Sequence, residues 1–164
     1  MGIMDLTLVP YGNAREVQHG KVWKFTCQNG PEECYGNLIQ TCAINIVKNV
    51  TVYFPFINCL EASKDIPRSV APTCAKQMGI DYKSINKCVE GPLGNQLEHE
   101  MAQKTNALQP PHKYVPWVTL NGVHTEEIQQ MAQSNLRKLI CDTYKGPKPP
   151  ACTEEHNQLR CLRE

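Results

Sequence analysis

CQNGPEECYGNLIQTC, residues 27–42, decides the fold, because it combines three cysteines, a turn and the start of a helix. Gly30-Pro31 interrupts the preceding segment, and proline suits the first turn of a helix, where its missing N–H has no partner to lose. Glu32 and Glu33 then add negative charge at the positive end of the helix dipole. The sequence therefore predicts a helix that begins at Pro31.

The apolar residues of this helix define a buried face. They recur at intervals of four and five, as on one side of an amphipathic helix, at Cys34, Leu38, Cys42, Ala43, Ile46 and Val47. Two of the cysteines thus face inward, and Cys27 can reach either of them or a neighbouring element. Because thiols on packed faces are usually inert, we interpret these cysteines as a disulfide-stabilised corner.

The same stretch resembles the signature of the gamma-interferon-inducible lysosomal thiol reductases: CQHG, two residues, EC, two residues, N, four residues, C. The matching positions are Cys27, Gln28, Gly30, Glu33, Cys34, Asn37 and Cys42, and Asn29 stands where the family usually has histidine. The resemblance continues through LTLVPYGNA (6–14) and NALQPPHKYVPWVTLNG (106–122), so it covers nearly the whole chain.

The resemblance implies an α/β, thioredoxin-like fold and an enzyme that reduces protein disulfides. The family's redox C-x-x-C lies on a strand and helix upstream of LTLVPYGNA, and these 164 residues contain no C-x-x-C. We therefore expect an N-terminally truncated member with an incomplete sheet, without catalytic residues and inactive as a thiol reductase alone. No cofactor is expected, and the substrates of the full-length parent would be disulfide-containing proteins or peptides.

Substrate binding is assigned by the resemblance to Val115 and Pro116. In the thioredoxin fold a cis proline occurs at this place, and the residue before it offers its backbone to the substrate like an added strand. The apolar run 114–120 before the hairpin signal Asn121-Gly122 predicts a strand. With the resemblance we expect a cis bond before Pro116; without it, trans would be the default.

The rest of the chain predicts further strands and a helical region. Residues 5–11 predict a strand, poorly anchored or shifted if the central strand is missing, and Gly20 opens a second extended run with Trp23 and Phe25 on one face. Residues 31–107 predict a bundle of short helices cut by Pro55, Pro67, Pro72, Gly79, Gly91-Pro92 and Gly94. His99 is expected on a solvated face.

We expect a thioredoxin-like domain over 1–144 with a helical, disulfide-stabilised insertion at about 31–107. A last helix follows the N-cap Thr125 and ends at Cys141, with an apolar stripe that includes Leu136. Residues 145–164 form a proline-rich linker and a cysteine-containing tail.

Nine cysteines indicate a disulfide framework and an oxidising compartment, lysosomal or extracellular. The candidates are Cys27, Cys34, Cys42, Cys59, Cys74, Cys88, Cys141, Cys152 and Cys161. No spacing suggests a metal site. The odd number leaves one thiol free or joined to another chain, which allows a disulfide-linked homodimer. Cys141 is expected to pair with Cys152 or Cys161, and Asn49 of Asn-Val-Thr is a glycosylation candidate.

Charge and hydropathy exclude other classes. Seventeen basic and sixteen acidic residues give a net charge of +1 without a block of one sign, so no nucleic acid or anionic membrane partner is expected. The longest apolar run, 50–57, is too short to span a bilayer. The N-terminal residues lack the features of a signal peptide, so we interpret Met1 as an internal or alternative start or an artificial boundary.

Three functions remain open, in this order of preference. The first is a truncated thiol reductase of an acidic compartment. The second is a secreted, disulfide-stabilised binding module that keeps a groove beside Pro116 for extended peptides but has lost catalysis. The third is a purely structural, cysteine-rich helical domain, against which the strand and Val-Pro-Trp elements argue.

Overall fold

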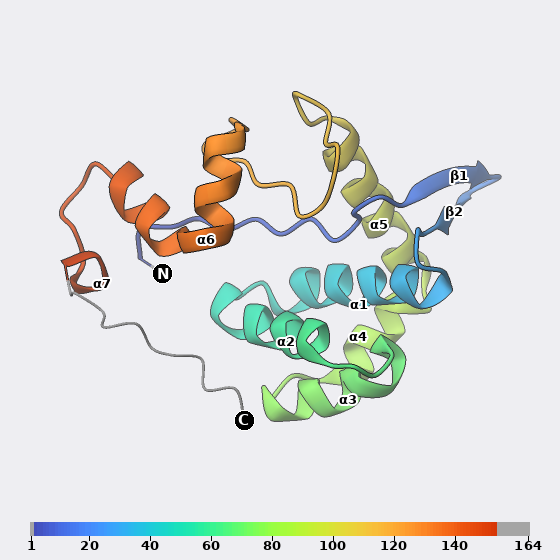
Figure 1. Ribbon diagram of the computed structural model, residues 1–164. Helices are drawn as coiled ribbons and strands as arrows, with labels where there is room; N and C mark the ends of the chain where they lie inside the picture. Colours follow the sequence, from blue (N-terminus) through green and yellow to red (C-terminus); the bar gives the residue numbers. More distant parts are fainter. Residues whose placement is uncertain (1, 154–164) are drawn as a thin grey trace. The chain divides into compact units, whose positions relative to one another are not determined.

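A computed structural model of the chain describes residues 2–153, which divide into two compact units (Figure 1). The larger unit is continuous and comprises residues 7–116. The smaller unit combines residues 2–6 with residues 117–153 of the described part. Within the described part the protein is mixed α/β, mostly helical, with one two-stranded sheet and four disulfides.

The larger unit consists of a hairpin followed by five helices. Its elements are β1 (Arg15–His19), β2 (Val22–Thr26), α1 (Pro31–Val47), α2 (Val50–Ala62), α3 (Pro67–Gln77), α4 (Tyr82–Val89) and α5 (Pro92–Asn106). The bundle of short helices expected over 31–107 is thus confirmed. The expected breaks at Pro67 and Pro92 are helix starts, where proline is well tolerated. Pro55 and Pro72, in contrast, lie inside α2 and α3, so the expectation that they end helices is wrong.

α1 occupies the centre of the bundle and packs against α2, α3, α4 and α5. Its burial therefore does not follow a single stripe: Ile39 and Thr41 are fully buried, whereas Ile46, expected inside, is 37% exposed. Phe56 of α2 and Ile85 of α4 are also fully buried in the same core. Proline at position 55 removes one backbone hydrogen bond from α2, which costs stability. Burial of the neighbouring Phe56 side chain offsets this cost.

The hairpin pairs β1 and β2 antiparallel, from Arg15 opposite Thr26 to His19 opposite Val22. The extended run with Trp23 and Phe25 on its inner face is confirmed, since both are partly buried. β1 was not predicted, because its one apolar residue, Val17, is 60% exposed and the strand is defined by pairing alone.

Two strands predicted from the sequence do not form. Neither residues 5–11 nor 114–120 belong to a strand in the described part of the chain. Alternating apolar residues favour a strand only where a neighbouring strand pairs with its backbone. Around Asn121-Gly122 the hairpin signal produces a single bridge, between Leu120 and Val123.

The smaller unit contains α6 (Glu126–Thr143) and α7 (Pro150–Thr153). Thr125 caps α6 as expected, with Oγ1 accepting a hydrogen bond from the Ile128 backbone N–H at 3.1 Å. The helix was expected to be continuous, but Asn135 has non-helical angles and its Oδ1 accepts from the Lys138 N–H at 2.9 Å. Asn135 thus caps a second half, and Leu136 is 43% exposed instead of buried.

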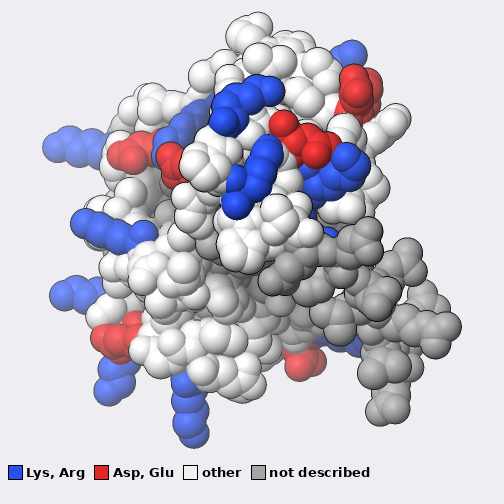
Figure 2. Space-filling model, turned by 90° about the vertical axis from the view of Figure 1, so that its left-hand side faces the viewer, with Lys and Arg blue, Asp and Glu red and all other residues white. Residues whose placement is uncertain are grey.

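The surface has no field of one sign on the face shown in Figure 2, where basic and acidic side chains are interspersed. Among the described helices, none has both the length and the apolar character that a bilayer crossing requires.

Candidate functional site

Residues 27–37, which we call the signature corner, hold six of the seven matched signature residues. Cys27 and Cys34 form a disulfide with a Cα–Cα distance of 5.5 Å, which closes the turn into α1. Gly30 has φ of +94°, a conformation that favours glycine, and Pro31 is the first residue of α1. Glu33 Oε2 accepts a hydrogen bond from the Asn29 backbone N–H across the same turn. The corner is therefore a cross-linked helix start.

Asn37 links the signature corner to a turn formed by residues 11–14. Its Nδ2 donates to the Tyr11 carbonyl at 3.3 Å and lies 4.0 Å from Cys27 Sγ. The Tyr11 carbonyl also accepts from the Ala14 N–H at 3.2 Å, which closes the turn itself. The signature asparagine thus fixes the position of this turn against α1.

A second connection reaches from the signature corner to residues 109–116, which we call the 109–116 loop. Asn13 Nδ2 donates to Gln28 Oε1 at 2.9 Å, and Asn13 Oδ1 lies 3.2 Å from His112 Nε2. Sequence patterns alone did not assign Asn13 or His112 to a functional site. Their presence within the two outer stretches of the family resemblance was the available signal.

The Val115-Pro116 peptide bond is cis, as expected from the resemblance. Val115 is 50% exposed, and it lies close to the 11–14 turn, since a Cβ on Gly12 would come within 3.9 Å of Val115 Cγ1. The structure thus brings the predicted substrate-binding residue Val115 beside the turn that carries Asn13.

The remaining bridges hold the helices together. Cys42 of α1 pairs with Cys88 of α4, and Cys59 of α2 pairs with Cys74 of α3, so each bridge cross-links two neighbouring helices. The signature residue Cys42 therefore lies at a different bridge from Cys27 and Cys34.

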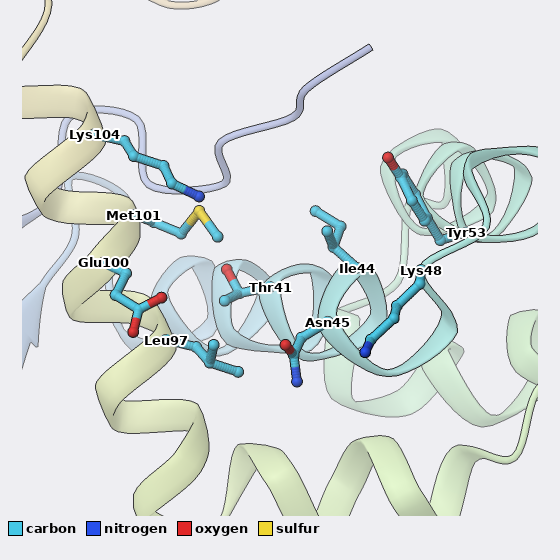
Figure 3. A pocket seen from close by; sticks show the side chains of 9 residues that line it. All are labelled: Thr41, Ile44, Asn45, Lys48, Tyr53, Leu97, Glu100, Met101 and Lys104. Carbon is cyan, nitrogen blue, oxygen red and sulfur yellow. The ribbon is translucent and has the colours of Figure 1, made fainter. Parts of the chain in front are cut away.

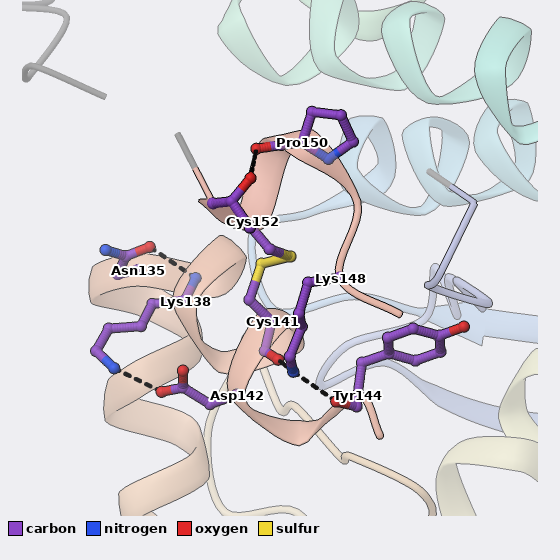
Figure 4. Close-up of a disulfide and its surroundings, with 9 residues drawn as sticks. Asn135, Lys138, Cys141, Asp142, Tyr144, Lys148, Pro150 and Cys152 are labelled. Atoms are coloured by element: carbon purple, nitrogen blue, oxygen red, sulfur yellow. Dashed lines mark hydrogen bonds and ion pairs between the residues drawn. A yellow bond between two sulfur atoms is a disulfide. The ribbon is translucent and has the colours of Figure 1, made fainter. Parts of the chain in front are cut away.

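Cys141 pairs with Cys152 and ties the segment after α6 back to that helix (Figure 4). Lys148 supports the same closure, because its Nζ donates to the carbonyls of Cys141 and Tyr144. Cys161 lies outside the described residues. All eight cysteines among residues 2–153 are thus in disulfides, and in this state none of these eight is a nucleophilic thiolate.

A buried carboxyl group, which the sequence analysis missed, lies between α5 and α1. Glu98 is 1% exposed and accepts a hydrogen bond from Thr41 Oγ1 at 2.8 Å. The pKa of Glu98 is raised to about 8: burial is the main cause, the Thr41 hydrogen bond opposes the rise, and the nearby Glu16 adds to it. Burial and the carboxylates of Glu16 and Glu98 likewise raise the pKa of Tyr11 to about 12.

His99 docks the hairpin on α5, so its assignment to a solvated face is wrong. Its Nδ1 lies 2.9 Å from Glu16 Oε1, and its ring stacks on Trp23 at 3.8 Å between centroids. Asn95 adds two hydrogen bonds with the Trp23 backbone, one as acceptor at 2.9 Å and one as donor at 2.7 Å. Both residues are polar in sequence but face a partner element.

The surface hollow shown in Figure 3 has a volume of about 330 Å³ and is lined by α1, α2, α5 and Lys48. Its lining combines apolar side chains such as Leu97 with the charged Lys48, Glu100 and Lys104. None of the signature residues lines it, and neither does Val115. We therefore do not assign disulfide chemistry to this hollow. Among residues 2–153, no three side chains of His, Cys, Asp or Glu are grouped so as to hold a metal ion.

Comparisons with known proteins agree on one group of relatives. Residues 1–78 match the family described as "Gamma interferon inducible lysosomal thiol reductase (GILT)". The chain is 44% identical over 151 residues to a gamma-interferon-inducible lysosomal thiol reductase of Carassius auratus, covering 92% of this chain and 59% of the relative. It is 37% identical over 156 residues to the protein of the same name from Mus musculus, covering 93% and 60%.

A more distant relative is covered more fully. The chain is 32% identical over 168 residues to GILT-like protein 1 of Drosophila melanogaster, covering 94% of this chain and 67% of the relative. The goldfish and mouse proteins are longer, and the chain spans about three fifths of their length.

Proposed function

Because this chain belongs to the gamma-interferon-inducible lysosomal thiol reductase family, we propose that it is part of a thiol–disulfide oxidoreductase that reduces protein disulfide bonds in the lysosomal or secretory pathway. The signature corner and its bonds to the 11–14 turn carry this proposal, because they join the stretches on which the family resemblance rests. The substrates are proteins or peptides that contain disulfides.

The reaction needs a dithiol that these 164 residues do not provide as C-x-x-C. In the reaction, one thiolate attacks a substrate disulfide and releases one substrate thiol, and the second thiol resolves the mixed disulfide. Two electrons thus pass from the dithiol to the substrate, and an external small thiol restores the dithiol. Since all eight described cysteines are bridged, this chain alone is proposed to be inactive.

An assay with the purified chain tests this inactivity. A protein substrate with interchain disulfides is incubated at acidic pH with a small thiol, and thiol release is followed with the goldfish relative as positive control. We expect no turnover above the thiol alone, and mass spectrometry after alkylation reports whether the chain's own bridges remain closed. Catalytic thiol release by the bridged chain would show that the proposed inactivity is wrong.

We propose a thioredoxin-like organisation for residues 1–144, with a helical insertion at about 31–107. A separate proline-rich linker and cysteine-containing tail follows at 145–164. The supporting observation is the family resemblance in residues 6–14 and 106–122, which flank the helical bundle.

Val115 and Pro116 are the proposed binding site for an extended substrate segment. The supporting observation is that Val115 is half exposed and belongs to neither strand of the described sheet. Val115→Asp is expected to weaken binding of an extended peptide, measured by fluorescence anisotropy. Val123→Asp is a matched control, since Val123 is 54% exposed in the other unit. Equal effects of both variants would contradict the assignment.

A second candidate function is a non-catalytic, disulfide-stabilised secreted module that binds extended peptides. The closure of every described cysteine favours it, since such a module needs bridges and no thiol. Peptide binding without turnover by a longer chain that contains C-x-x-C would favour this function over the first.

We further propose glycosylation at Asn49 and a disulfide-linked homodimer through the ninth cysteine, Cys161. Asn49 is exposed, as a glycan acceptor must be. A non-reducing gel of the wild-type chain and of Cys161→Ser tests the dimer, which the variant should lose.

A further inference from the structure

The 11–14 turn is a fixed point beside the proposed substrate loop. Tyr11 is 3% exposed, and its ring meets Phe25 edge-on at 6.4 Å between centroids. Its carbonyl accepts from both the Ala14 N–H and Asn37 Nδ2. The turn is therefore held by the core below it, by its own closure and by α1.

Asn13 extends from this fixed turn toward two partners. Its Nδ2 donates to Gln28 Oε1 at 2.9 Å, which fixes the orientation of the amide. Its Oδ1 then faces His112 Nε2 at 3.2 Å, and because an amide oxygen only accepts, His112 carries a proton on Nε2. One side chain thus joins the signature corner to the 109–116 loop.

The loop that Asn13 holds presents Val115. It forms no strand in the described residues, so no ladder of backbone hydrogen bonds sets its position. We propose that Asn13 is a positioning residue for peptide binding: through His112 it holds the 109–116 loop so that Val115 and Pro116 can receive an extended peptide. This inference rests on the function proposed above, and Asn13 itself is not proposed to contact the peptide.

The expected size of the effect follows from the two hydrogen bonds. A neutral side-chain hydrogen bond makes only a modest contribution to the stability of a structure. Loss of both hydrogen bonds in Asn13→Ala is therefore expected to weaken peptide binding about tenfold. Asn13→Asp keeps an oxygen for His112 but loses the donor to Gln28, and an intermediate effect is expected. His112→Ala removes only the second of these hydrogen bonds but breaks the same link to the loop, so it should weaken binding in the same direction, and the double variant should add little to Asn13→Ala.

The experiment measures the loop and the peptide separately. ¹⁵N relaxation gives backbone order parameters for residues 112–115 of the 164-residue chain with its bridges intact. Fluorescence anisotropy gives the affinity for a linear labelled peptide whose one cysteine is capped as a mixed disulfide. Gln18→Ala is the matched control, because it removes another exposed side-chain hydrogen bond, from Gln18 Nε2 to the Gly20 carbonyl.

The inference predicts that Asn13→Ala lowers the order parameters of residues 112–115 from about 0.85 toward about 0.6, while Gln18→Ala does not. The inference is overturned if the order parameters are unchanged in Asn13→Ala, or if they change equally in Gln18→Ala. Altered order together with unchanged peptide affinity also overturns it. The wild-type chain could bind no peptide while Asn13→Ala still lowers the order parameters. In that case the proposed binding function fails, whereas the role of Asn13 in holding the loop is supported.

Discussion

Replacement of Glu98 by glutamine should flatten the dependence of stability on pH. Glu98 is 1% exposed, its hydrogen bond comes from the uncharged Thr41, and its charged neighbours include Glu16. The folded protein therefore favours the neutral carboxyl group, with a pKa of about 8 against the ordinary 4.5. Glutamine has nearly the same shape and is neutral at every pH.

The direction in which stability changes with pH follows from the raised pKa of Glu98. The folded state binds the Glu98 proton more tightly than the unfolded state does, so its stabilising effect is complete below about pH 4.5 and is lost as the pH rises through about 8. The difference between 4.5 and about 8 is about 3.5 pKa units, and at 1.36 kcal/mol per unit this corresponds to about 5 kcal/mol at most. For a chain of this length, that is a shift in Tm of roughly 10–20 °C.

The assay is thermal unfolding followed by circular dichroism between about pH 4 and pH 8, with the disulfides intact. The difference in Tm between Glu98→Gln and the wild type should grow in favour of the variant as the pH rises. Glu90→Gln, an exposed carboxyl at the end of α4, is the control and should follow the wild type. If the Tm values of Glu98→Gln and the wild type differ by the same amount at every pH, the reasoning is refuted. Stability that increases in acid would suit the acidic compartment proposed above.

Three further predictions concern single positions. Asn49→Asp should abolish glycosylation in secretory expression, as gel mobility would show, but keep the helix cap on the Thr51 N–H. Asn49→Ala should lose both the glycan and the cap, and denaturation should show that its free energy of unfolding falls by about 1 kcal/mol. Replacing both Cys42 and Cys88 by alanine should cost about 4 kcal/mol, because their bridge spans 46 residues of sequence separation; an unchanged urea midpoint would contradict this. Gly94→Ala should strongly lower Tm, since its Cβ would lie 2.3 Å from the Cys88 carbonyl oxygen, whereas Gly2→Ala, which meets nothing within 4 Å, should not.

The candidate site was predictable as a set of motifs but not as an arrangement. The signature residues and Val115-Pro116 could be found from their order along the chain. Asn13 and His112 could not be assigned, because they lie 99 positions apart and only folding brings their side chains within 3.2 Å. Glu98 was missed for a similar reason, since a glutamate in a polar stretch gives no sign that Thr41 and the core will enclose it.

The strands show where local sequence patterns fail to predict the structure. Residues 5–11 and 114–120 have the apolar content of strands but do not form them, while Arg15–His19 forms a strand with one apolar residue. A strand depends on hydrogen bonds to another segment, and no local pattern shows whether that segment is in place.

The sequence by itself determined the helix that begins at Pro31, the helical bundle and the cap at Thr125, because these depend on residues within a turn or two of each other. It also indicated the family, through the resemblance of residues 27–42 to a known signature. Only the tertiary structure decided which cysteines pair, that His99 docks the hairpin, and that Glu98 is buried. These features depend on distances between segments far apart in the chain, which local patterns do not encode.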